Sequence, residues 1–184
     1  MTGRAVFLKV ALVSATLLLP AGNAAAGCAA EPFVRNAGAA IMGAARARSA
    51  TAFSGVASRY ADLRSIAIFA LGPYRGSLRR SREAEYVRLT RAFIGRFMLK
   101  HARRFTGDGL NIISCTGGRT LTVKVKLRGG QNVIFRIHKT RAGYRVQDLN
   151  VSSVWLAQQL RSTFTGVIRR NDGDVGALMR FLRG

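Results

Sequence analysis

The stretch that decides the fold is YRVQDLNVSSVWL, residues 144–156. Its first part, from Tyr144 to Val151, is typical of a β-strand. From Ser153 onward, apolar residues recur at helical spacing and predict an amphipathic helix over residues 153–170. The apolar positions of this helix are Leu156, Leu160, Phe164 and Val167. A shorter helix is expected over residues 172–182, so the chain closes with a strand followed by two helices.

Three more strands are expected before this one, because apolar and polar residues alternate over residues 110–115, 120–127 and 133–138. Glycines mark the turns at 117–118, 129–130 and 143. Sequential strands with short turns form an antiparallel meander with one apolar face, and helices must cover that face. The sequence therefore predicts an α+β fold, a curved four-stranded antiparallel sheet wrapped by helices.

The covering helices are expected in two blocks. Residues 31–74 are Ala-rich and helical in pattern, with Asp62 placed to cap a helix that Gly72 and Pro73 end. A long helix is expected from Ser81, its N-cap, to Arg103 or Arg104. Its apolar arc covers about half of the circumference, which is wide for one neighbour. Either this helix packs against both a sheet and another helix, or part of the arc lines a cavity for an apolar ligand.

The N-terminus has the pattern of a secretory signal. Arg4 and Lys9 flank or enter an apolar run over residues 10–19, and Ala24 to Ala26 supply the small residues of a cleavage site. The apolar run is too short to span a membrane, which takes about 20 apolar residues. We expect a signal peptide over residues 1–26 and one domain over residues 27–184, beginning at Gly27. An alternative is a lipoprotein signal in which Cys28 becomes the acylated first residue.

Charge suggests what the exported domain meets. Without the signal peptide, 28 Lys and Arg residues face 8 Asp and Glu residues, a net charge of +20. Such an excess attracts anionic surfaces such as lipid headgroups, lipopolysaccharide, nucleic acid or an acidic protein. A basic surface without a dedicated partner is the alternative. The only cysteines, Cys28 and Cys115, allow a disulfide in an oxidising compartment but do not establish one, and they fit no metal site.

Catalytic groups are scarce. Hydrolysis needs a nucleophile beside a base or two facing carboxylates, and no such pair is visible. His138 is expected on the polar face of its strand and His101 near the end of a basic helix, both in solvent. Asp148 is a lone carboxylate without a recognisable partner. We therefore predict no catalytic residues, no metal and no cofactor, and we do not expect an enzyme.

Two segments resemble a known family. Residues 60–75, YADLRSIAIFALGPYR, contain an Asp, an Ile-Ala-x-Phe-x-Leu-Gly run and an aromatic-Arg pair. With residues 144–182 they resemble the MlaC/toluene-tolerance family of periplasmic lipid-binding proteins. The chain departs from the family at Ser152 and Ser153, where Glu-Gly is frequent, and at Leu160, where Tyr is common. These departures leave the size of the ligand open.

The resemblance implies an NTF2-like/MlaC-like fold and a phospholipid carrier. Such a carrier holds acyl chains in an apolar cavity and exchanges lipid between an outer-membrane lipoprotein complex and an inner-membrane MCE-type ABC transporter. It implies a periplasmic monomer that touches membranes transiently and has no nucleic-acid partner. The alternatives are an exported basic protein that binds anionic ligands such as lipopolysaccharide or nucleic acid, and a component of hopanoid transport.

The carrier hypothesis assigns residues to two surfaces. The expected lipid-binding residues are Phe69, Leu71, Tyr74, Phe93, Phe97, Val123, Val125, Phe135, Ile137, Val151, Val154, Trp155 and Phe164. The expected docking residues for headgroups or an acidic partner are Arg75, Arg79, Arg80 and Arg82. Each apolar residue of the first set would serve equally well as ordinary core.

Overall fold

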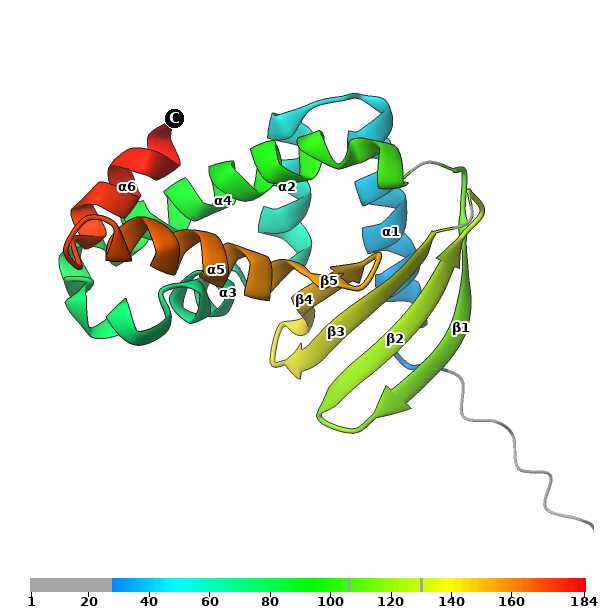
Figure 1. The fold of residues 1–184 in the computed structure, drawn as a ribbon. Coiled ribbons are helices and arrows are strands. Elements are labelled where there is room, and N and C mark those ends of the chain that lie inside the picture. Colours follow the sequence, from blue (N-terminus) through cyan, green and yellow to red (C-terminus); the bar gives the residue numbers. More distant parts are fainter. Residues whose placement is uncertain (1–27, 106, 130) are drawn as a thin grey trace, which may run out of the picture.

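A computed structural model describes residues 28–105, 107–129 and 131–184. Over these residues, six α-helices and one antiparallel sheet form an α+β fold (Figure 1), which confirms the predicted fold class. The predicted signal peptide, residues 1–26, lies outside the described residues. Within the described ranges, no helix combines the length and the apolar character that crossing a membrane requires.

The helices lie in two groups along the chain. Before the sheet come α1 (Glu31–Arg46), α2 (Ala50–Tyr60), α3 (Leu63–Ala70) and α4 (Glu83–Lys100), with 3-10 turns η1 (Gly72–Ser77), η2 (Arg80–Arg82) and η3 (Ala102–Phe105). After the sheet come α5 (Leu156–Arg169) and α6 (Val175–Arg183). In Figure 1, α6 packs on α4 and α5 at the end of the molecule farthest from the sheet.

The sheet is a meander in which each strand pairs with the next. It contains β1 (Leu110–Gly117), β2 (Thr120–Leu127), β3 (Asn132–Thr140), β4 (Gly143–Val151) and β5 (Val154–Trp155), in that order and antiparallel throughout. Its inner face carries buried Val123, Phe135 and Ile137, whereas Lys124 and Lys126 alternate with them on the exposed outer face. The alternation predicted for β2 and β3 is therefore confirmed.

The sequence-based boundaries need two corrections around the helices. Helix α5 begins at Leu156 instead of Ser153, because Ser152 and Ser153 both have positive φ (50° and 66°) and turn the chain back to form the short strand β5. Two consecutive residues with positive φ are typical of a type I′ hairpin turn. The long helix begins at Glu83 instead of Ser81, because residues 80–82 form a 3-10 turn, and it ends at Lys100.

The hydrophobic core lies between the inner face of the sheet and the helices. Asp62 caps α3 as predicted, since its carboxylate accepts a hydrogen bond from the backbone N–H of Ser65. The backbone N–H of Asp62 donates to the carbonyl of Val146 on β4, 2.9 Å away. This bond fixes the junction of α2 and α3 to the sheet, so both helices keep a defined position over its inner face.

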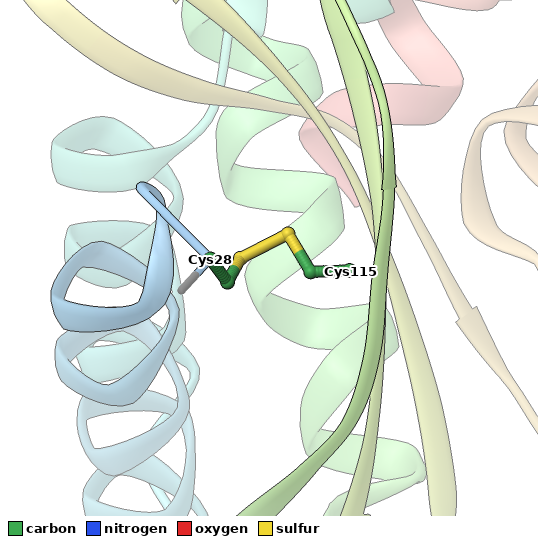
Figure 2. The surroundings of a disulfide bond; sticks show 2 residues. All are labelled: Cys28 and Cys115. Carbon is green, nitrogen blue, oxygen red and sulfur yellow. A yellow bond between two sulfur atoms is a disulfide. The ribbon is translucent and has the colours of Figure 1, made fainter. Parts of the chain in front are cut away.

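A disulfide joins the start of α1 to the edge strand of the sheet. Figure 2 shows Cys28 bonded to Cys115 on β1, with Cα atoms 5.6 Å apart. The bond closes a long loop, because the two cysteines are 87 residues apart. The sequence left this pairing open. The sulfur that a lipoprotein acyl group would modify is thus bonded to Cys115.

Candidate functional site

An apolar chamber lies between the inner face of the sheet and helices α1 to α5. Its volume is about 70 Å³. Its walls are built from Ala37, Ile41, Phe53, Val56, Ala57, Tyr60, Ala61, Ile66, Ile94, Met98, Phe135, Val146, Asp148, Leu149, Leu156 and Ala157. Only Tyr60 and Asp148 bring polar side chains to this wall, so the chamber offers an environment for hydrocarbon.

Small residues on the helices create this space. Ala37 on α1 and Ala57 on α2 face the sheet at positions where larger side chains would fill the gap. Helix α2 is held at the far side by α4, because Gly95 lets the two backbones approach closely: a Cβ at Gly95 would lie 2.4 Å from the carbonyl oxygen of Ala50. Helix α2 therefore packs tightly against α4 on one side, and on its other side the small residues leave space between it and the sheet.

Strand β4 turns its side chains toward the chamber through a bulge. Arg136 pairs with Asp148 and Ile137 pairs with Val146, so Gln147 is an extra residue in β4. The bulge places Val146 and Leu149 on the inner face although they are three positions apart, where a regular strand would place them on opposite faces.

Asp148 is buried beside the chamber, with 6% of its surface exposed. One carboxylate oxygen accepts hydrogen bonds from the backbone N–H groups of Leu149 (2.8 Å) and Ala157 (2.9 Å). Burial raises the pKa of Asp148, while these hydrogen bonds and the charge of Arg136 act in the opposite direction. The sequence showed no partner for Asp148, and the structure supplies one: Asp148 binds the first turn of α5 and fixes that helix to β4.

A second chamber lies beside the first. Its volume is about 230 Å³, and it shares Met98, Leu149 and Leu156 with the first. The remaining residues around it are Phe97, His101, Arg104, Phe105, Val151, Val154 and Gln159. We call this second chamber the mouth. Most of the residues that line the mouth are apolar, and the polar side chains among them are His101, Arg104 and Gln159.

Both histidines are less exposed than the sequence suggested. The ring of His101 packs on Phe97, with centroids 4.6 Å apart, and its pKa is lowered by burial and by the charges of Arg104 and Lys100. The side chain of His138 is only 19% exposed, because its Nε2 faces Asp62 Oδ2 at 3.4 Å. Both histidines lie where the sequence placed them, on the outer side of β3 and at the end of α4, but each is only partly exposed.

The structure distributes the expected lipid-binding residues over several places. Phe135 lines the inner chamber, and Phe97, Val151 and Val154 line the mouth. The others lie away from both chambers: Leu71, Val123, Val125, Ile137 and Phe164 are buried in the core, Phe93 packs on Phe164, Tyr74 is partly buried in η1, Phe69 lies under Arg161 and Trp155 under Arg136. The cation-π contact of Trp155 places the guanidinium of Arg136 4.2 Å from the ring centroid.

The wall residues that sequence reasoning missed lie mainly on α1 and α2. Ala37, Ile41 and Ala57 belong to the Ala-rich block, where the pattern predicted helices but assigned them no ligand. A signal was present: small residues at inward positions of a helix indicate either close packing or retained space. Only the position of α2 over the sheet distinguishes between the two.

The expected docking arginines do not border either chamber. Arg75 lines a separate open groove with Phe69 and Arg161, and Arg79 and Arg80 are exposed. Arg82 is bound to Glu85 at 3.0 Å, so its charge is engaged within the chain. Over the described ranges there is also no group of three or more His, Cys, Asp or Glu side chains arranged to hold a metal ion.

Comparisons with known proteins identify the family. A solved structure described as a phospholipid-binding protein from Ralstonia solanacearum, in complex with a phospholipid, has the same fold, with a TM-score of 0.71 at 16% sequence identity. That match covers 84% of this chain and 94% of the other. No curated protein matches the sequence. The model of the family described as MlaC protein matches residues 36–184. The expected resemblance is confirmed, and this chain belongs to the MlaC family.

Proposed function

We propose that this protein is a phospholipid carrier that holds acyl chains in the inner chamber and leaves the headgroup at the mouth. The observation that carries the proposal is an apolar chamber, walled by Phe135 and Ala57 among others, directly beside a mouth that shares Met98 with it and is also lined by polar side chains. Membership of the MlaC family and the phospholipid in the structure of the same fold from Ralstonia solanacearum support it.

The free energy of transfer requires such a chamber. Each methylene leaving a bilayer forfeits about 0.8 kcal/mol unless it enters an equally apolar site. The inner chamber holds about 70 Å³, whereas small-molecule pockets span roughly 300–1,000 Å³. Lipid entry must therefore widen the chamber, and we propose that α1 and α2 move away from the sheet. Their small inward residues leave weak contacts there, while the disulfide at Cys28 keeps the start of α1 attached.

The proposed place of work is the periplasm. The N-terminal signal pattern supports export, and the Cys28–Cys115 disulfide is a feature of oxidising compartments. We further propose that the carrier moves lipid between an outer-membrane lipoprotein complex and an inner-membrane MCE-type transporter, with exposed arginines such as Arg79 and Arg80 assisting contact with anionic surfaces. The protein acts by binding and release, without catalysis.

A substitution that fills the chamber tests the proposal. Ala57→Phe places a ring in the inner chamber, so lipid extracted from the purified protein should fall several-fold per mole of protein. Thr51→Phe adds the same ring to the exposed side of α2 and should leave bound lipid unchanged. Mass spectrometry of solvent extracts measures the lipid, and thermal unfolding checks that both variants fold.

The outcome separates the hypotheses. Wild-type protein that carries no lipid and takes none from labelled vesicles contradicts the carrier function. Equal lipid content in both variants contradicts the assignment of the chamber. An extract that contains lipopolysaccharide or a hopanoid in place of phospholipid would support the corresponding alternative.

A further inference from the structure

Basic side chains are concentrated around the mouth. Lys100 ends α4, His101 follows, and Arg103 and Arg104 lie in η3, so four basic side chains occupy five consecutive positions. Arg104 and His101 border the mouth directly, and Lys100 and Arg103 are exposed beside them. We call these four residues the basic rim.

The acidic residues of the chain leave the basic rim uncompensated. Glu83, Glu85 and Asp174 bind other arginines, Asp108 lies near Arg128, and Asp148 is enclosed by backbone N–H groups. Among the described residues, no ion pair involves Lys100, Arg103 or Arg104. The positive charge at the mouth is therefore available to a ligand.

The position of the rim decides which ligand chemistry it favours. Phe97, Val151 and Val154 form an apolar surface in the mouth, and Gln159 on α5 faces the same opening as Arg104. A ligand that fills this opening must be apolar below and anionic above. A guanidinium binds phosphate oxygens through two parallel hydrogen bonds. If the headgroup also carries an ammonium group, the two positive charges repel each other and the lipid binds more weakly.

We propose that the basic rim selects phospholipids whose headgroup has a net negative charge, such as phosphatidylglycerol, over zwitterionic ones such as phosphatidylethanolamine. This inference rests on the proposed carrier function, because the rim acts on a lipid whose acyl chains lie in the chambers. Arg104 contacts the phosphodiester. The neutral ring of His101, fixed against Phe97, offers it an N–H donor, and the pKa of His101 rises when the anion arrives.

Competition within one membrane tests the selection. Delipidated protein is incubated with vesicles that contain equal amounts of phosphatidylglycerol and phosphatidylethanolamine with matched acyl chains, and the bound lipids are extracted and quantified by mass spectrometry. We expect wild-type protein to be enriched several-fold in phosphatidylglycerol. Because both lipids share the same vesicle, attraction of the basic protein to the membrane affects them equally.

Three variants locate the cause. Arg104→Gln should bring the bound ratio close to that of the vesicle while total bound lipid per protein stays the same. Gln159→Glu places a negative charge across the mouth and should favour phosphatidylethanolamine. Arg119→Gln removes the same charge as the first variant from the exposed β1–β2 turn, at the opposite end of these strands from the mouth, and should keep the wild-type ratio.

Each result has a defined meaning. A wild-type ratio equal to that of the vesicle overturns the inference and leaves the carrier function intact. Equal losses in Arg104→Gln and Arg119→Gln also overturn it, because net charge alone would then explain the preference. Absence of any bound lipid contradicts the carrier function and the inference together.

Discussion

Individual small residues determine where the protein keeps space. Ala37 and Ala57 face the chamber from two helices, and the bulge at Gln147 directs both Val146 and Leu149 toward it. Neither feature gives a distinct pattern in the sequence. Alanine is common in helices, and a bulge interrupts the alternation of inward-facing and outward-facing residues along the strand. The sequence did identify Phe135 as an inward residue, since β3 alternates without interruption.

Asp148 shows how a buried carboxylate can serve the fold. Because burial raises its pKa, the folded chain binds a proton more readily than the unfolded chain. Its contribution to stability is therefore most favourable below the unfolded pKa of about 3.9 and becomes unfavourable as pH rises through the folded value. At neutral pH the hydrogen bonds to Leu149 and Ala157 offset part of that cost.

Two substitutions at Asp148 separate charge from hydrogen bonding. Asp148→Asn keeps an acceptor oxygen without the charge, so at pH 7 it should be at least as stable as wild type, and this advantage should disappear near pH 4. Asp148→Ala leaves two N–H groups unpaired and should lose about 1–3 kcal/mol. Urea unfolding at both pH values measures the differences. An Asn variant that is as unstable as the Ala variant at pH 7 would show that the charge itself is required.

At the scale of elements, the contact between α2 and α4 sets the position of the chamber wall. A Cβ on Gly95 would lie 2.2 Å from Ser54 Oγ and 2.4 Å from the carbonyl oxygen of Ala50. The second atom belongs to the backbone, so a side chain at Gly95 must push the two helices apart.

Two glycine substitutions on these helices should have opposite effects. Gly95→Ala should destabilise the protein by about 1–3 kcal/mol through overpacking. Gly55→Ala on α2 has no atom within 4 Å of the new Cβ, so it should stabilise the helix by about 0.5–1 kcal/mol. Urea unfolding measures both. A Gly95→Ala variant as stable as wild type would show that the helices do not approach this closely.

The elements themselves were largely predictable, and their junctions were not. Strands β1 to β4 and the final helices follow from hydrophobic period, and Asp62 is a recognisable cap. The short strand β5 was missed because it depends on positive φ at Ser152 and Ser153, a conformation that serine rarely adopts. The start of α4 was misplaced because Ser81 looks like a cap, although a 3-10 turn precedes the helix.

For the whole molecule, covalent and electrostatic features act across long distances. The Cys28–Cys115 bond ties α1 to the sheet edge, and native disulfides of this kind contribute about 2–5 kcal/mol. The wide apolar arc of α4 packs against α2, α3 and α6, with Leu89 in the core, and from the same arc Ile94 and Met98 line the chamber. Sequence could not decide this, because the answer depends on how far α2 stands from the sheet.

Photo-crosslinking tests the central claim that acyl chains enter the chamber. Protein loaded with a phospholipid that carries a diazirine at the end of one acyl chain is irradiated, digested with trypsin and analysed by mass spectrometry. Crosslinks should fall on the peptide 49–59 of α2, which contains Phe53 and Ala57, and on the peptide 146–161, which contains Leu149 and Leu156. Crosslinks confined to the outer face of β2, around Lys124 and Lys126, in protein that carries lipid would contradict the account.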